Sequence, residues 1–292
     1  MGKIVIIVPA TSSNLGAGIN SLGIAFKLYS TVIVEEKTDH WIVNHSLPGI
    51  PHDANNLIVQ TILRIDPKIA PRQLTVMSDI PSARGLGAST SAIIAGVKIA
   101  NALGHLHLSL KQQINVGGRF VGHPECVSSG ILGDLTASAS DGRTVTTVKA
   151  KMPAVLALMY IMKNRPRITG KIRPQLNRVK LPEVIKAVEI SNVLIAAVMD
   201  NHWDKASKIM EDDPIAQHRQ FHEVPDLKLI RSVAHRLGIY STYLNGVGPI
   251  IVTFGEKVAL NRLRRKLSHY SSLDGTFRLL GIDRSGTTVR GE

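Results

Sequence analysis

The sequence is poor in the residues that several classes of protein require. One cysteine, Cys126, stands among 292 residues, so the chain cannot build an internal disulfide framework and fits a reducing compartment. Only 4% of the residues are aromatic, which is few for a surface that stacks single-stranded bases. The longest strongly apolar runs, residues 153–162 and 193–199, are too short to span a bilayer, and the run 4–10 is too short for a signal-peptide core. We expect a cytoplasmic protein with no membrane partner.

The remaining composition is that of a globular protein with a strong positive charge. The chain is 44% apolar and 20% charged, and its length suits two packed domains. A net charge of +13 attracts anions, from a nucleotide to a nucleic acid. Basic residues cluster in 163–180 and 262–266, and the second cluster lies on a predicted helix, 257–267, with leucines on its other face. A solvated helix face explains that cluster, so nucleic acid is a minor hypothesis.

Residues 81–91, PSARGLGASTS, predict a site for phosphate groups, and we call this segment the cradle. It follows a predicted strand at 74–78 and opens a predicted helix at 91–103. Glycines let the backbone approach an anion, and the first N–H groups of a helix point toward it. The hydroxyls at 89–91 could bind a phosphate or its magnesium ion. The segment is neither a P-loop nor a dinucleotide fingerprint, so a tight turn with a polar helix cap stays open as an alternative.

The rest of the chain mixes strand and helix patterns without regular alternation. A strand at 3–8 should end at Pro9, and loops rich in glycine and serine are expected at 10–21 and 121–135. Ser109 is placed to cap a helix that runs to about residue 120. This pattern predicts an α+β fold. We expect two domains, residues 1–150 and 151–292.

Six motifs in the same order resemble the GHMP small-molecule kinases, and within that superfamily the homoserine kinases. Together they extend over most of the chain, which makes the set far more specific than any one motif. The motifs are VPATSSNLGAGINSLG at 8–23, the cradle at 81–91, GHPECV at 122–127, T-x-x-x-R at 169–173, D-x-x-x-x-x-R at 213–219 and the turn at 245–249.

The resemblance implies a GHMP kinase fold, with an N-terminal domain like ribosomal S5 domain 2 and a ferredoxin-like C-terminal domain. It implies transfer of the ATP γ-phosphoryl group to the side-chain hydroxyl of L-homoserine, which gives O-phosphohomoserine on the route to threonine. ATP and Mg²⁺ are the implied cofactors. A homodimer is left open.

The same resemblance assigns residues to three groups. Ser89, Thr169 and Arg173 are expected to act in catalysis, and Ser89 to ligate the metal. Arginine suits a carboxylate, because its guanidinium can bind both oxygens at once. The expected amino-acid pocket consists of Asn14, Asn20, His123, Cys126, Arg173 and Arg219. The expected ATP site consists of Asn56, Pro81, Arg84, Gly85, Leu86, Gly87, Ala88, Ser89, Thr90 and Ser91.

The chain departs from the family pattern at positions in the expected site. Val121 stands where the family has a magnesium-ligating glutamate, and valine offers the ion no oxygen. Glu125 is a candidate replacement if its side chain reaches the metal. The other departures are Asn20 for aspartate, Ala88 for serine, Cys126 for asparagine, Asn245 for serine and Val247 for alanine.

Two functions therefore stay open. The first is an active kinase for homoserine or a related amino alcohol. The second is a catalytically degenerate relative that binds a nucleotide or small molecule, which the loss of a glutamate at Val121 favours. Retention of the cradle, His123 and the two arginines favours the first.

Overall fold

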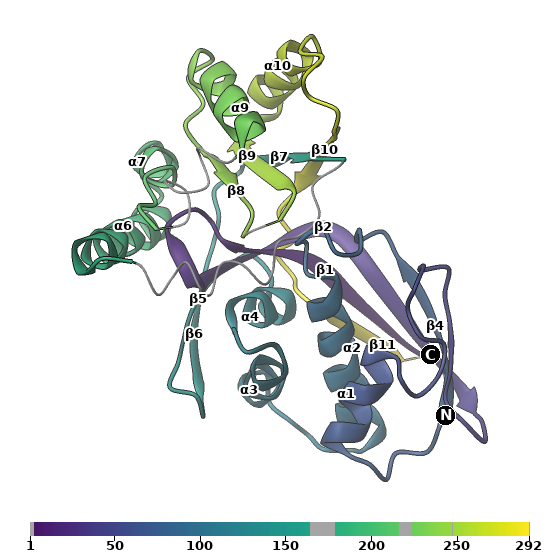
Figure 1. The fold of residues 1–292 in the computed structure, drawn as a ribbon. Helices are drawn as coiled ribbons and strands as arrows, with labels where there is room; N and C mark the ends of the chain where they lie inside the picture. Colours follow the sequence, from purple (N-terminus) through teal and green to yellow (C-terminus); the bar gives the residue numbers. More distant parts are fainter. Residues whose placement is uncertain (1–2, 164–178, 216–223, 247, 292) are drawn as a thin grey trace.

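The computed structural model describes residues 3–163, 179–215, 224–246 and 248–291. It contains two sheets (Figure 1). The first has seven strands, hydrogen-bonded in the order β11-β1-β2-β4-β3, with β5 paired to β2 and to β6. Its strands are β1 (Ile4–Asn14), β2 (Gly18–Lys37), β3 (Ile42–Asn44), β4 (Arg72–Ser78), β5 (Leu135–Ser140), β6 (Val145–Ala150) and β11 (Thr288–Gly291).

Four helices pack on one face of this sheet (Figure 1). They are α1 (Leu57–Ile65), α2 (Ala88–Leu103), α3 (Leu110–Val121) and α4 (Glu125–Leu132). Ser109 begins α3 as predicted, because its hydroxyl accepts from the Gln112 N–H and the Gln112 side chain accepts from the Ser109 N–H.

The second sheet is antiparallel, in the order β10-β7-β9-β8. Its strands are β7 (Leu156–Ile161), β8 (Thr242–Leu244), β9 (Ile250–Gly255) and β10 (Thr276–Gly281). Among the described residues of this region, the helices are α6 (Leu181–Met199), α7 (Trp203–Ile209), α9 (Pro225–His235) and α10 (Lys257–Leu267). The predicted helix near 257–267 is confirmed, with Leu260, Leu263 and Leu267 fully buried and the basic residues 262 and 264–266 exposed.

Alternating residues of the second sheet face two different cores. Leu158 and Ile251 pack with α9 and α10, whereas Met159 and Phe254 point to the opposite face. That opposite face packs against the first sheet. There the ring of Phe254 in β9 stacks on the ring of Phe26 in β2, with 6.2 Å between their centroids. The two sheets therefore share one apolar core, on which α6 and α7 also pack.

Two predicted loops are wrong. Strand β1 continues through Pro9 to Asn14, because Pro9 lies at a shift of register where a β-bulge tolerates a residue without an N–H. The connection to β2 is only residues 15–17. In the segment 121–135, α4 occupies residues 125–132, and its small residues serve close packing: a Cβ on Gly130 would lie 2.4 Å from Ile94 Cδ1. Helix α2 also begins three residues earlier than predicted, at Ala88.

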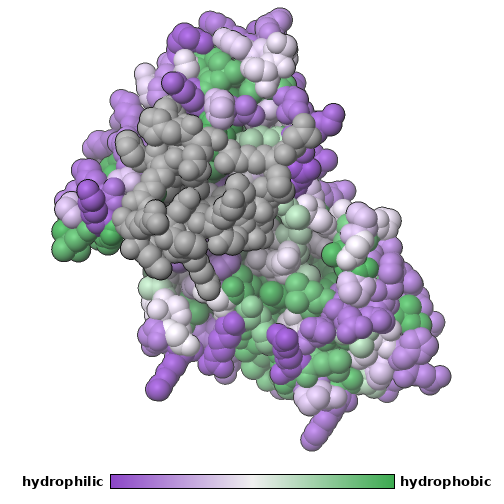
Figure 2. Space-filling model, in the orientation of Figure 1, coloured by the Kyte–Doolittle hydropathy of each residue, from purple (hydrophilic) through white to green (hydrophobic). Residues whose placement is uncertain are grey.

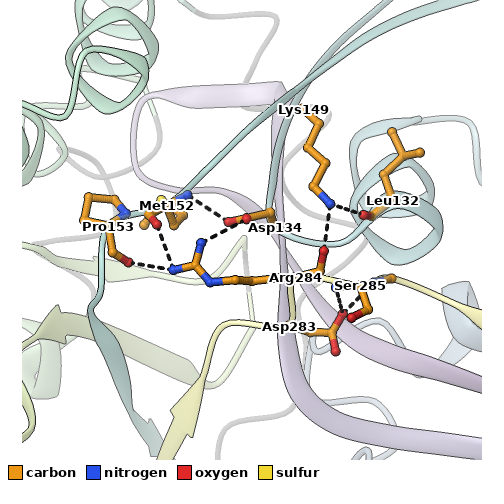
Figure 3. Close-up of polar contacts among 9 residues, drawn as sticks. Leu132, Asp134, Lys149, Met152, Pro153, Asp283, Arg284 and Ser285 are labelled. Carbon is orange, nitrogen blue, oxygen red and sulfur yellow. Dashed lines mark hydrogen bonds and ion pairs between the residues drawn. The ribbon is translucent and has the colours of Figure 1, made fainter.

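The sheets change between β6 and β7, near the predicted domain boundary, and β11 returns to the first sheet beside β1. The two crossings between the sheets are tied together by Arg284 (Figure 3). Its guanidinium lies 3.2 Å from an Asp134 carboxylate oxygen and donates to the Met152 carbonyl oxygen at 2.9 Å. Asp134 also accepts from the Met152 N–H at 2.8 Å. The division into two domains stays a prediction.

Helix α6 has an exposed apolar face, visible at the left edge of Figure 2. None of the helices in the described part of the chain is both long and apolar enough to cross a membrane. The exposed apolar residues of α6 are Leu181, Val184, Ile185, Val188, Val193 and Met199.

Candidate functional site

The cradle is a turn in which glycine is required. Gly85 and Gly87 have φ angles of +87° and +74°, and Gly87 is the N-cap of α2 with no side chain capping the helix. A Cβ on Gly87 would lie 2.2 Å from the Thr11 Oγ1 atom. Between the glycines, Leu86 is fully buried, and its carbonyl accepts from the Thr11 N–H at 3.1 Å. The turn is therefore fixed against β1, and the first N–H groups of α2 lie free of any side-chain cap.

A cavity of about 780 Å³ opens beside this turn. That size falls within the range of small-molecule sites. The helix N-terminus supplies partial positive charge, so the cavity combines an end that suits an anion with a largely apolar lining. Its lining includes His45, Leu47, Ile50, Ile80, Lys163 and the N-terminal turn of α1.

The structure brings half of the predicted ATP-site residues to the cavity. Ser89 lines it with an exposed side chain. Ser91 also lines it, but its hydroxyl donates to the Ala88 carbonyl at 2.8 Å and so serves the helix. Asn56 lies at the edge as the N-cap of α1, where its side chain accepts from the Ile58 N–H. The five predicted residues that line the cavity are Asn56, Arg84, Ala88, Ser89 and Ser91.

The other five have different surroundings. Leu86 contributes its side chain to the core rather than to the cavity, and Thr90 is buried. Pro81, Gly85 and Gly87 shape the turn that carries the lining residues. Arg84 is both a lining residue and a link between the sheets, because its guanidinium donates to the Met162 carbonyl at 2.8 Å.

A buried hydrogen-bond chain connects the cradle to two other glycine-rich segments. Asn245, 1% exposed, donates from Nδ2 to the Gly85 carbonyl at 2.8 Å and accepts from the Ser12 hydroxyl at 2.8 Å. The Tyr243 hydroxyl lies 3.0 Å from Ser12 Oγ, and burial raises the pKa of Tyr243 far above its ordinary value. Because Tyr243 stays neutral, its hydroxyl can donate to Ser12. Sequence reasoning noted Asn245 only as a departure and missed Ser12 and Tyr243.

Four of the six residues predicted for the amino-acid pocket lie in the described part of the chain, and they form two pairs. Asn14 and Asn20 meet at the tip of the β1–β2 hairpin, where the Asn14 side chain accepts from the Asn20 N–H at 3.1 Å. Both have positive φ, +76° and +56°, which asparagine tolerates well. His123 and Cys126 lie together at the start of α4. Thr169, Arg173 and Arg219 lie outside the described residues.

The Val121 side chain has no oxygen atom that could bind a metal ion. It is partly buried at the end of α3 and packs against the core under the first sheet. Glu125, 1% exposed, binds His123 through Oε1, with a distance of 3.0 Å to Nδ1. Its second oxygen, Oε2, is buried and has no hydrogen-bond partner among the described residues.

Comparison with known proteins agrees with this geometry. Residues 56–142 match the family model for the GHMP kinases N terminal domain. The chain is 36% identical over 288 residues to a homoserine kinase of Lactiplantibacillus plantarum, a match that covers 98% of each chain. It is 40% identical over 246 residues to a homoserine kinase of Bacillus cereus, which covers 84% of this chain and 82% of that one.

A structural match leads to the same family. A structure described as a "putative homoserine kinase" from Listeria monocytogenes superposes with a TM-score of 0.87 at 32% identity, over 99% of this chain and 100% of that chain. The predicted GHMP kinase fold is thus confirmed. The chain belongs to the homoserine kinase family of the GHMP kinases.

Proposed function

We propose that this chain transfers the γ-phosphoryl group of ATP to the side-chain hydroxyl of L-homoserine. The observation that carries the proposal is the cradle: a glycine turn and an uncapped helix N-terminus beside a nucleotide-sized cavity. A near-full-length relative described as a homoserine kinase supports the same reaction.

The cavity fits ATP by shape and chemistry. The N–H groups of the first turn of α2 would bind the phosphates, and the Ser89 hydroxyl would donate to one of them. Apolar residues of the lining, among them Ile50 and Ile80, would contact the adenine. When bound, ATP supplies the phosphoryl group. The chain's own contribution is to position the groups and to neutralise charge, which is most of what phosphoryl transfer requires.

We propose that the acceptor binds between the β1–β2 hairpin and the start of α4. Asn14, Asn20 and His123 would orient the amino acid through hydrogen bonds, and Cys126 would line the same pocket. Arg173 and Arg219 match family positions for binding a carboxylate, so they stay proposed ligands from the sequence.

Mg²⁺ would enter with ATP, held largely by phosphate oxygens and water. Ser89 is the described side chain that fits it, as an exposed oxygen ligand at the head of α2. The segment 121–126 fits it poorly. Valine has no ligand atom, and the buried Glu125 is grouped with a thiol and an imidazole, which are not preferred by a hard cation.

The test is ADP release from the purified chain with Mg-ATP, with and without L-homoserine. Homoserine-dependent ADP release is expected, together with O-phosphohomoserine as the product. L-serine, one methylene shorter, should support at least tenfold less turnover, because a missing methylene is worth roughly 10–200-fold. No acceptor-dependent ADP release at any homoserine concentration would contradict the proposal.

The second candidate is a nucleotide-binding relative without turnover, and the packing of Val121 against the core favours it. A Val121→Glu/Cys126→Asn double variant separates the two. If the unmodified chain binds ATP without turnover and the double variant releases ADP, the site is degenerate on an intact scaffold. Equal activity of both proteins would support the kinase.

A further inference from the structure

His123, Glu125 and Cys126 form a compact group of potential metal ligands. They lie within four residues at the junction of α3 and α4, and one ligand atom from each lies within 4.8 Å of the other two. Within the described residues, this is the one group of three such side chains found together. Gly122, with a φ of +80°, and Pro124 hold the junction in a tight turn, so the three side chains project from a short, ordered segment.

The group contains a buried polar atom that nothing satisfies. Glu125 is 1% exposed, its Oε1 bonds His123 Nδ1, and its Oε2 has no hydrogen-bond partner among the described residues. A buried carboxylate oxygen without a partner is costly, and native structures rarely keep one without a reason. A cation bound between the three side chains would satisfy it.

We propose that this group binds a borderline-soft divalent cation, for which Zn²⁺ is the natural probe. Imidazole, thiolate and carboxylate are all zinc ligands, whereas Mg²⁺ prefers oxygen donors alone. The three ligand atoms lie within 4.8 Å of one another, which is near the spacing that a bound zinc ion needs. In a tetrahedral zinc site, ligand atoms lie about 3.4–3.6 Å apart. The His123 side chain is 34% exposed, so it can rotate to bring its ring nitrogen closer to the other two ligand atoms.

Three protein ligands leave a fourth position for water or another ligand, as in zinc sites that stay open. The cation would occupy His123 and Cys126, which we also propose as acceptor contacts. Bound Zn²⁺ should therefore weaken acceptor binding. That consequence rests on the proposed function, whereas metal binding itself does not.

The test uses Co²⁺ as a spectroscopic substitute for Zn²⁺, added to the metal-free full-length chain. A thiolate-to-cobalt charge-transfer band is expected to saturate at one Co²⁺ per chain and to disappear on addition of Zn²⁺. Because Cys126 is the single cysteine of the sequence, such a band identifies its ligand without ambiguity.

Variants then assign the other two ligands. Cys126→Asn should abolish the band and raise the Kd for Zn²⁺ at least about 100-fold, since even outer-shell changes cost 10–100-fold. Glu125→Gln and His123→Asn should each raise it at least about tenfold. The exposed residues Glu36 and His269 serve as controls, and Glu36→Gln and His269→Asn should leave the Kd unchanged.

Absence of a thiolate band in the folded, unmodified chain would overturn the proposal. So would an unchanged Zn²⁺ affinity in Cys126→Asn or in His123→Asn. Circular dichroism of each variant establishes that it is folded. Because His123 is partly exposed, the His123→Asn variant is expected to keep Glu125 and Cys126 in place. Since the readout is binding, the result stands whether or not the chain turns over homoserine.

Discussion

The side-chain amide of Asn245 donates to the carbonyl oxygen of Gly85 at 2.8 Å, although 160 residues separate them. Asn245 also accepts from the Ser12 hydroxyl at 2.8 Å. One buried side chain therefore joins the hairpin strand β1, the cradle and the turn after β8. This amide therefore contributes to the relative placement of all three segments.

Replacing Asn245 with alanine should destabilise the chain and weaken ATP use. The change removes the side-chain donor to the Gly85 carbonyl and leaves the Ser12 hydroxyl with Tyr243 as its one side-chain partner, a loss of two hydrogen bonds that costs about 1–3 kcal/mol. We expect kcat/KM for ATP to fall about tenfold, the factor that corresponds to 1.4 kcal/mol. Urea denaturation and steady-state kinetics measure the two effects. Asn192→Ala, at an exposed position of α6, is the control and should change neither. An unchanged free energy of unfolding in Asn245→Ala would mean that the hydrogen bonds are replaced by water.

Gly87→Ala should abolish ATP binding, and Gly142→Ala should not. Both glycines have positive φ angles, +74° and +85°, so both substitutions strain the backbone. Only at Gly87 would the new Cβ collide with a neighbour, Thr11 Oγ1 at 2.2 Å, whereas nothing lies within 4 Å at Gly142. Equilibrium binding of a fluorescent ATP analogue distinguishes them. Equal loss in the two variants would show that strain, and not the fit of the turn against β1, controls the site.

Val121→Glu should reduce the Mg²⁺ requirement of the reaction. It adds an anionic oxygen where the family pattern has one, and a charge-assisted interaction is worth about 1.5–3 kcal/mol. We expect the Mg²⁺ concentration for half-maximal ADP release to fall about tenfold. Val121→Gln has a similar shape without the charge and should leave the requirement as it is. If both variants lower the requirement equally, the effect comes from reshaping the end of α3 and not from metal ligation.

Lys98→Met should stabilise the fold at neutral pH, and the gain should shrink as pH rises. Lys98 is 7% exposed in α2, and burial lowers the pKa of its ammonium. A lysine whose pKa is lower in the folded state than in the unfolded state destabilises the fold at every pH at which its buried amine is protonated. That penalty is complete well below the folded-state pKa, and it falls as pH rises from that pKa toward the ordinary lysine value near 10.

Thermal unfolding at pH 7 and at pH 10 measures this effect. A gain of about 1 kcal/mol at pH 7 corresponds to a rise in Tm of roughly 2–4 °C. Lys111→Met, on the exposed surface of α3, should change Tm by less than about 1 °C at either pH. A gain for Lys98→Met that does not depend on pH would point to packing and not to charge.

Local patterns predicted those parts of the structure that residues close together in the sequence build. The cradle is one such part, because its turn, its glycines and the start of the helix that follows lie within 11 consecutive residues. The role of Asn245 could not be read in this way, since its partners Ser12 and Gly85 are distant in sequence. The one signal in the sequence that pointed to Asn245 was that it replaces the serine of the family's turn.

The errors in secondary structure have a similar cause. Pro9 looked like the end of a strand, yet a bulge in the pairing with β2 lets β1 continue. The segment 125–132 looked like a loop because it is rich in small residues, but small residues also let a buried helix approach its neighbours closely. Both decisions depend on tertiary packing, which overrides local preference.

Arg284 holds together the two crossings of the chain between the sheets. These crossings limit how the two sheets can move relative to one another. A body attached at one point can swivel in any direction, whereas a body attached at two neighbouring points turns mainly about the line that joins them. Arg284 bonds Met152 in one crossing from its own place in the other, which keeps those two points together. Any relative motion of the two sheets should therefore turn about that line, and the apolar core that the sheets share opposes it. Because Arg84 and Asn245 also join the two sheets at the cradle, any opening of the cradle would have to break these hydrogen bonds.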